Sequence, residues 1–84
     1  MIEWDAVKRR INLEKHGVDF AAAAQFAWDS AMVAADDRFD YGEDRFVAIG
    51  WIAGVAHTMV FARRGANIRI ISLRRSSRTE RKLL

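Results

Sequence analysis

The chain has 84 residues and no cysteine, and 51% of its residues are hydrophobic. This length matches one small domain, which we expect to span residues 1–84, and so high an apolar fraction excludes an intrinsically disordered chain. The lack of cysteine excludes disulfide bonds and thiolate chemistry. Glycines and a histidine interrupt the longest apolar stretch, residues 46–62, which excludes a membrane span. We therefore expect a cytoplasmic protein that does not bind a membrane.

The net charge of +3 conceals an unequal distribution of charge along the chain. Residues 1–44 contain five Lys or Arg against ten Asp or Glu, a net charge of −5. Residues 45–84 contain nine Lys or Arg against the single acid Glu80, a net charge of +8. This asymmetry predicts that the second half binds a nucleic acid or another acidic partner. The alternative is that the two halves neutralise each other across the fold.

Two helices are predicted near the N-terminus. Asp5 is placed to cap a helix over residues 6–16, and Gly17 follows as its C-terminal stop. Asp19 is placed to cap a second, alanine-rich helix over residues 20–27, with two phenylalanines as its bulky apolar residues. Both helices therefore precede any predicted strand.

Four strands and a short helix are predicted in the rest of the chain. The strands correspond to apolar or alternating runs over residues 31–35, 45–52, 55–63 and 67–74. Ala53-Gly54 predicts a hairpin between the middle two strands, and the spacing of Ser77 and Glu80 predicts a capping box for a helix over residues 78–84. The order of elements predicts an α+β fold with two N-terminal helices, a four-stranded, mostly antiparallel sheet and a short C-terminal helix.

Three blocks of the sequence resemble the BrnT family of bacterial toxins, which belongs to the wider RelE-like ribonuclease group. The first block, residues 4–18, is similar to the family's opening pattern WDxxKxxxNxxKHGV. The second block, residues 40–45, resembles its YGExR turn, and the third, residues 64–80, resembles its RG…RIISxR…E segment. The three blocks occur in the family's order and together cover nearly the whole chain.

The resemblance implies a RelE-like fold and a toxin that cleaves RNA without a metal ion or another cofactor. It also implies neutralisation by a BrnA-like antitoxin, in a complex expected to be a heterotetramer. The chain departs from the family pattern at two places. It ends in Leu83-Leu84, where the family commonly has a tyrosine, and it has Arg63 where family members tend to have an acid. The resemblance therefore does not carry over a terminal aromatic residue as a base-stacking or acid–base group.

Arginine suits metal-free cleavage of RNA, because its planar guanidinium binds phosphate through two hydrogen bonds and keeps its charge. The ribose 2′-hydroxyl attacks the adjacent phosphate, so the protein must stabilise charge on the phosphate oxygens and transfer two protons. We predict Arg64, Arg69 and Arg74 as catalytic residues, because they match family positions and lie near the last two predicted strands. This hypothesis requires their guanidinium groups to converge on one place. The alternative is that they are solvated or paired with acids of the first half.

Glu80 is the only acid of the basic half, so it is a candidate general base or a residue that orients an arginine. The alternative is that it only caps the last helix with Ser77. His16 and His57 fit structural roles better, because one follows a predicted helix end and the other lies in an apolar strand. Four further cations are predicted to bind the substrate: Arg63, Arg75, Arg78 and Lys15.

The acidic turn over residues 36–44 does not fit a calcium loop, because Tyr41 and Val47 occupy the positions that require glycine and glutamate. No Cys and His spacing indicates zinc, so we predict no metal site. The favoured function is an endoribonuclease toxin. Two alternatives remain open: a non-catalytic nucleic-acid-binding module, and a docking module whose basic face binds an acidic partner. Arginines that bind a phosphate and arginines that act beside a scissile phosphate look alike in sequence.

Overall fold

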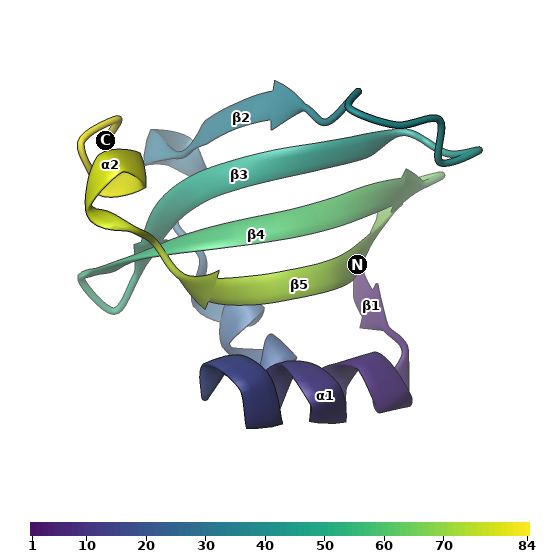
Figure 1. The fold of residues 1–84 in the computed structure, drawn as a ribbon, viewed down its shortest axis with the longest axis horizontal. Helices are drawn as coiled ribbons and strands as arrows, with labels where there is room; N and C mark the ends of the chain where they lie inside the picture. The colour runs from purple at the N-terminus through teal and green to yellow at the C-terminus, as the bar shows by residue number, and fades with distance from the viewer.

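The computed structural model describes residues 1–84 and contains one five-stranded sheet with strand order β1-β5-β4-β3-β2. Strands β2 to β5 are antiparallel to their neighbours, and β1 is parallel to β5. Helix α1 lies along the β5 side of the sheet, while α2 follows β5 and lies at the far end of the strands (Figure 1). None of the helices has the length and apolar character needed to span a bilayer. The elements in chain order are β1 (Ile2–Trp4), α1 (Ala6–His16), the 3₁₀ helices η1 (Phe20–Gln25) and η2 (Trp28–Ser30), β2 (Met32–Ala35), β3 (Arg45–Ile52), β4 (Val55–Arg64), β5 (Asn67–Arg75) and α2 (Arg78–Arg81).

The start of the chain confirms the first predicted helix and adds a strand that was not predicted. The Asp5 carboxylate accepts a hydrogen bond from the backbone N–H of Lys8 at 2.9 Å, and Gly17 ends α1 with a φ of 71°. Before the helix, β1 pairs with β5 through the register Ile2 to Ile68. The prediction of four strands was therefore wrong, because a three-residue strand is too short to show a period in sequence.

The second predicted helix, residues 20–27, is a shorter 3₁₀ helix, η1. Asp19 caps it as predicted, by accepting a hydrogen bond from the backbone N–H of Ala21 at 3.0 Å. Phe20, Ala23 and Phe26 are all buried, and their spacing is three residues. A helix with three residues per turn keeps such residues on one face, which explains why the alanine-rich segment does not form an α-helix.

The three long strands match the sequence prediction closely. β3 has the predicted bounds, and β4 and β5 each extend one residue further than predicted. Ala53 and Gly54 have φ values of 48° and 78°, the pair of positive angles that a tight hairpin turn requires. The predicted capping box of α2 is present, but the helix ends at Arg81 and not at residue 84.

The sheet has one face covered by α1, η1 and η2, and an opposite face that we call the open face. Met59 and Phe61 of β4 point into the core, so the alternate residues Ala62 and Arg64 point to the open face. Gly50 of β3 lies against Phe26, whose ring tip is 2.5 Å from where a Cβ would lie, so no side chain fits there. The main core residues are Val18, Phe20, Ala23, Phe26, Ala48, Ile52, Met59, Phe61, Ile70 and Leu73.

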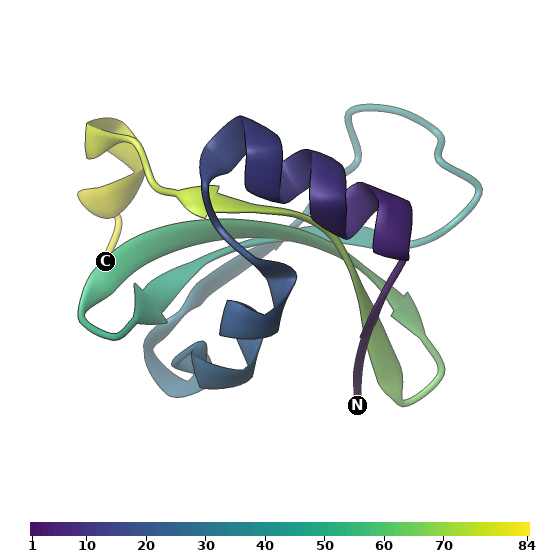
Figure 2. The ribbon, with the colours of Figure 1, turned by 90° about the horizontal axis from the view of Figure 1, so that it is seen from below.

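A buried asparagine joins α1 to the sheet. Asn12 is 5% exposed, and its side-chain amide donates hydrogen bonds to the carbonyls of Leu73 and Val18 at 2.7 and 3.0 Å. Its carbonyl oxygen accepts a hydrogen bond from the backbone N–H of Leu73 at 3.1 Å. Figure 2 shows α1 lying across β5. Asn12 therefore satisfies backbone groups of β5 beyond the point where β1 stops pairing with it.

Candidate functional site: arginines of the open face

Three arginines from neighbouring strands gather on the open face. Arg45 of β3 lies opposite Ala62 of β4, and Ala62 lies opposite Arg69 of β5, so these residues form one row across the sheet. Arg64 lies two residues beyond Ala62 on the same face of β4. Ala62 is fully buried, which shows that neighbouring side chains cover its methyl group. We call Arg45, Arg64 and Arg69 the open-face arginine cluster.

Two carboxylates lie beside the cluster, but neither holds its arginines tightly. Glu43 accepts a hydrogen bond from Nε of Arg45 at 3.2 Å and lies 3.6 Å from Nη2 of Arg64. Glu3 of β1 lies 3.8 Å from Nη1 of Arg69. A strong hydrogen bond between a guanidinium and a carboxylate is about 2.7–2.9 Å long. Three cations therefore share two acids at distances that leave guanidinium donors free.

An aromatic ring fixes the position of Arg45. The guanidinium carbon of Arg45 lies 4.0 Å from the centre of the Tyr41 ring, and its side chain is 23% exposed. Stacking on an aromatic face orients the planar guanidinium without using its hydrogen-bond donors. The loop before β3 thus supplies both Tyr41 and Glu43 as supports for one arginine of the cluster.

Arg74 does not join the cluster, so the expected convergence of Arg64, Arg69 and Arg74 was wrong. Arg74 lies five residues after Arg69 on β5, which separates their Cα atoms by about 16 Å. Its guanidinium donates two hydrogen bonds to the carboxylate of Glu80, at 2.7 and 2.8 Å. The structure brings together Arg64 and Arg69 and adds Arg45, while Arg74 forms a separate pair at the other end of β5.

Glu80 is held by more than Arg74. One of its carboxylate oxygens also accepts a hydrogen bond from the backbone N–H of Ser77 at 2.8 Å, and the Ser77 hydroxyl accepts one from the N–H of Glu80 at 3.2 Å. The hydrogen bonds from Arg74 lower the pKa of Glu80 to about 2, with a smaller contribution from Ser77 and an opposing one from burial. A carboxylate this acidic and this fully hydrogen-bonded is a poor acceptor for a proton near neutral pH.

The Glu80 pair gives stability a predictable dependence on pH. Its pKa is lower in the folded chain than the ordinary value of 4.5, so its contribution is full above pH 4.5 and disappears as the pH falls towards 2. We expect Glu80→Gln to destabilise the chain by about 1 kcal/mol at pH 7, a figure reduced for partial exposure, and by much less at pH 2.5. Glutamine preserves the capping box, so only the charge is tested.

The measurement is urea unfolding of both proteins at pH 7, 4 and 2.5. Glu14→Gln, at an exposed position of α1 without an ion pair, is the control, and its difference from the original protein should stay small at every pH. If the difference in free energy of unfolding between Glu80→Gln and the original protein stayed the same from pH 7 to pH 2.5, the ion pair of Arg74 and Glu80 would not have the role assigned to it.

The four predicted substrate-binding cations lie in different places. Arg63 points to the helix-covered face and lines an apolar cavity, so it does not share a surface with Arg64. Arg75 lies opposite His57 at the end of β5, and Arg78 is exposed in the first turn of α2. None of these three arginine side chains lies beside the open-face arginine cluster.

Lys15, the fourth predicted cation, does line a basic hollow. The hollow has a volume of about 230 Å³ and lies between α1 and the outer edge of β5. Ile71 has no partner in the β4–β5 register, which shifts there, and it lines this hollow beside Ser72. No acidic residue contributes to the lining, which consists of Lys8, Ile11, Asn12, Lys15, His16, Ile71 and Ser72.

The sequence prediction of the site omitted Arg45, Glu43 and Glu3. Arg45 and Glu43 belong to the YGExR block on which the resemblance was based, but only the register shows that Arg45 lies in one row with Arg69. Glu3 reaches Arg69 because β1 pairs with β5, and β1 was not predicted. His57 has a structural environment, as predicted, with Nδ1 2.8 Å from the carbonyl oxygen of Val55.

Comparison with known proteins gives the same assignment as the three sequence blocks. Residues 4–80 match the family described as "Ribonuclease toxin, BrnT, of type II toxin-antitoxin system". A search among proteins of curated function gave no significant match. The matched region contains every element of the sheet except the first two residues of β1, and it contains the whole open-face cluster. The chain belongs to the BrnT family, the ribonuclease toxins of type II toxin–antitoxin systems.

Proposed function

We propose that this chain cleaves RNA without a metal ion and that the open-face arginine cluster holds the scissile phosphate. The 2′-oxygen forms a bond to phosphorus and the bond to the 5′-oxygen breaks, so one proton leaves the 2′-hydroxyl and another reaches the departing oxygen. Negative charge grows on the two non-bridging oxygens during this step, and guanidinium donors stabilise it. The observation that supports this proposal is the row of Arg45, Ala62 and Arg69, with Arg64 beside it, on one face of a rigid sheet.

The loose pairing within the cluster favours exchange of carboxylate for phosphate. Exposed ion pairs contribute only about 0–1 kcal/mol, and the Arg64 side chain is 54% exposed. A bidentate contact between arginine and phosphate has two charge-assisted hydrogen bonds, each about twice as strong as a neutral one. Arg64 and Arg69 therefore lose little when they turn from Glu43 and Glu3 towards a phosphate.

Arg74 and Glu80 act outside the open-face arginine cluster, at a phosphate next to the scissile phosphate. Glu80 positions Arg74 through two short hydrogen bonds, and Arg74 directs its remaining donors to a neighbouring phosphate of the same strand. Proton transfer is not assigned to Glu80, because its oxygens are occupied by Arg74 and Ser77. Arg74 thus extends the phosphate-binding surface along β5.

The basic hollow between α1 and β5 extends the same surface at the edge of the sheet. Lys8, Lys15 and His16 surround it, and Ser72 adds a hydroxyl from β5. We place a flanking phosphate of the RNA there, because the hollow combines positive charge with a hydrogen-bonding side chain. Arg75 and Arg78, which lie near the end of β5, remain candidates for weaker contacts with the strand.

Removal of the hollow's lysines should change the salt dependence of RNA binding. We expect Lys8→Ala with Lys15→Ala to reduce the slope of log K against log salt by about 1.4, which corresponds to two lost contacts with single-stranded phosphate. The measurement is fluorescence-anisotropy titration of a single-stranded RNA at several salt concentrations. Lys82→Ala, at the end of α2, is the control and should leave the slope unchanged. Equal slopes for the double variant and the original protein would show that RNA does not contact the hollow.

The cleavage proposal is tested by incubating the purified chain with RNA in the presence of EDTA. Cleavage that leaves a 2′,3′-cyclic phosphate supports the proposal, since this product follows from attack by the 2′-hydroxyl. Cleavage that requires an added divalent ion contradicts metal independence. Salt-dependent binding without cleavage would instead favour the non-catalytic RNA-binding module.

We also propose that the antitoxin of this toxin is BrnA-like, that the two proteins form a heterotetramer and that the complex is cytoplasmic. Membership of a type II family implies a protein antitoxin and an RNA substrate. The BrnA-like identity and the stoichiometry rest on the resemblance of the sequence blocks. The mass of the purified complex in solution tests the stoichiometry.

A further inference from the structure

Strand β2 is an exposed edge of the sheet. It pairs only with β3 and is last in the strand order, so one of its two sides carries no hydrogen-bonding partner. All four of its residues are exposed, and Met32 and Val33 are each 50% exposed despite being apolar. Proteins usually protect such an edge with charged residues or proline, and β2 contains neither.

The backbone groups that face outwards from β2 follow from its ladder. The N–H of Asp36, directly after the strand, donates to the carbonyl of Arg45 at 2.8 Å. In an antiparallel strand, the backbone groups of successive residues point alternately to one neighbour and the other. Ala34 and Met32 therefore also form backbone hydrogen bonds with β3, whereas the N–H and C=O groups of Val33 and Ala35 point away from the sheet. The free edge therefore has two residues available for pairing with another strand.

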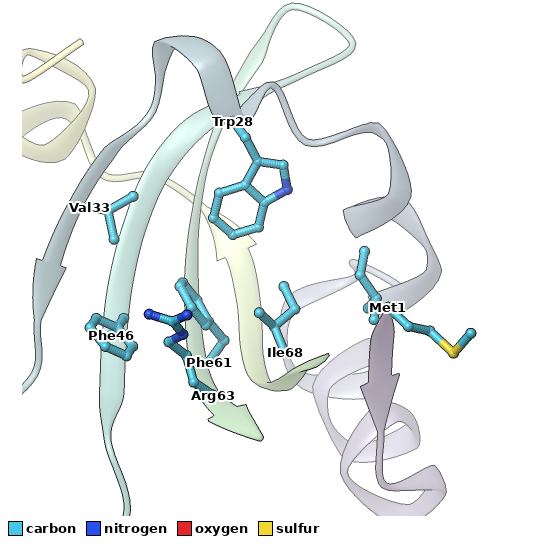
Figure 3. A pocket seen from close by; sticks show the side chains of 8 residues that line it. Met1, Trp28, Val33, Phe46, Phe61, Arg63 and Ile68 are labelled. Atoms are coloured by element: carbon cyan, nitrogen blue, oxygen red, sulfur yellow. The ribbon is translucent and has the colours of Figure 1, made fainter. Parts of the chain in front are cut away.

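Apolar hollows lie on both faces of this edge. On the helix-covered face, a cavity of about 450 Å³ begins at Val33 of β2 and Phe46 of β3 (Figure 3). It extends across the sheet to the β1 and β5 side, and the rest of its lining consists of Trp28, Phe61, Arg63, Ile68, Met1 and Ile2. On the open face, a smaller hollow of about 130 Å³ is lined only by apolar residues: Met32, Val33, Ala34, Val47, Ile49 and Leu83. Val33 lines both hollows. Successive side chains of an added strand would point alternately towards one hollow and the other.

We propose that β2 is a docking site for an extended segment of the antitoxin, which adds to the sheet as a sixth strand. Backbone pairing with Val33 and Ala35 supplies the attachment, and apolar side chains at alternate positions fill the two hollows. The exposed carboxylates of Asp29 and Asp37 flank β2 and form no ion pair, so they complement basic residues at the ends of the segment. This proposal depends on membership of the BrnT family, whose toxins have an antitoxin partner, and not on the proposed cleavage mechanism.

A second copy of this chain fits the same edge less well. Two β2 strands paired antiparallel would bring Asp37 of one copy close to Asp29 of the other, whereas Asp36 is buried and paired with Arg38. Like charges placed opposite each other destabilise strand pairing. The charges around β2 thus favour a partner with the opposite sign over self-association.

The test uses prolines at the two outward positions. Val33→Pro and Ala35→Pro remove N–H groups that the sheet does not use, and proline is tolerated on an edge strand. We expect each variant to bind the cognate antitoxin about 100-fold more weakly in calorimetric titration, because a proline blocks strand addition. Its RNA cleavage rate should stay within about twofold of the original, because the arginine cluster is unchanged. Val33→Ile, which keeps the N–H and the apolar character, is the matched control and should bind normally.

A measurement on the unmodified chain gives the same information without a substitution. The amide hydrogens of Val33 and Ala35 should exchange rapidly with deuterium in the free toxin and at least about tenfold more slowly in the complex. Unchanged antitoxin affinity of both proline variants, or unchanged exchange at both amides, overturns the proposal. The proposal is also overturned if the free toxin is a dimer and the proline variants are monomers, because the edge would then bind a second copy of the chain. Loss of antitoxin binding with no cleavage by any form would leave the docking site supported and reject the cleavage mechanism.

Discussion

Alanine at Arg64 or Arg69 is expected to lower the rate of RNA cleavage by about 100-fold to 1,000-fold, the usual effect of removing one preorganised donor from an anion-stabilising site. The physical reason is the row across the open face, in which each guanidinium is carried by a different strand around the buried Ala62. The measurement is the single-turnover rate on a defined RNA in EDTA. Stability should change by less than about 1 kcal/mol, because the carboxylates paired with these arginines lie at 3.6 and 3.8 Å.

Arg63→Ala is the matched control for Arg64→Ala. The two arginines are adjacent in sequence and both exposed, but Arg63 points to the opposite face and lines the apolar cavity. Its replacement should leave the cleavage rate within about twofold. Equal losses of rate for Arg63→Ala and Arg64→Ala would show that the open face is not the catalytic surface. If both Arg64→Ala and Arg69→Ala kept the full cleavage rate, the open-face arginine cluster would have no part in catalysis.

Asn12→Ala should produce the largest loss of stability of any substitution considered, about 3 kcal/mol in the free energy of unfolding. Three hydrogen bonds are lost, and the N–H and C=O of Leu73 and the C=O of Val18 are left without this partner. A buried group that loses its partner costs about 1–3 kcal/mol. For a domain of this size the midpoint of thermal unfolding should fall by about 12 °C or more. Urea and thermal unfolding measure both quantities.

Asn67→Ala is the corresponding control. Asn67 begins β5, is partly exposed and makes no side-chain hydrogen bond in the structure, so its replacement should change the free energy of unfolding by about 0.5 kcal/mol or less. A loss below about 1 kcal/mol for Asn12→Ala would show that water replaces the amide and that α1 is not fastened to β5 by this residue.

The parts of the fold that the sequence predicted are those with strong local signals. Asp5 and Gly17 define both ends of α1, and Ala53-Gly54 defines the hairpin that joins β3 to β4. The parts that were wrong depend on distant contacts. β1 exists because Ile2 pairs with Ile68, and the 3₁₀ form of η1 follows from burial of Phe20 and its neighbours against the sheet.

The candidate site was predictable in residue type but not in arrangement. The charge pattern indicated arginines near the last two strands, and two of the three chosen arginines lie together on the open face. Strand register determines which arginines share a row, and it placed Arg45 rather than Arg74 beside Arg69. The pairing of Arg74 with Glu80 requires the position of α2, which the capping box predicts only as a local structure.

The contacts of β1 and α1 with β5 determine when this fold can close during translation. Ile2 meets Ile68, and Asn12 meets Leu73, contacts that join residues more than 60 positions apart. Contacts this distant in sequence form late, because a long loop must close first. β1 and α1 therefore dock only after β5 has left the ribosome. The row of Arg45, Ala62 and Arg69 likewise forms only after β5 has been made, so chains that stop before β5 lack the surface that we propose to bind RNA.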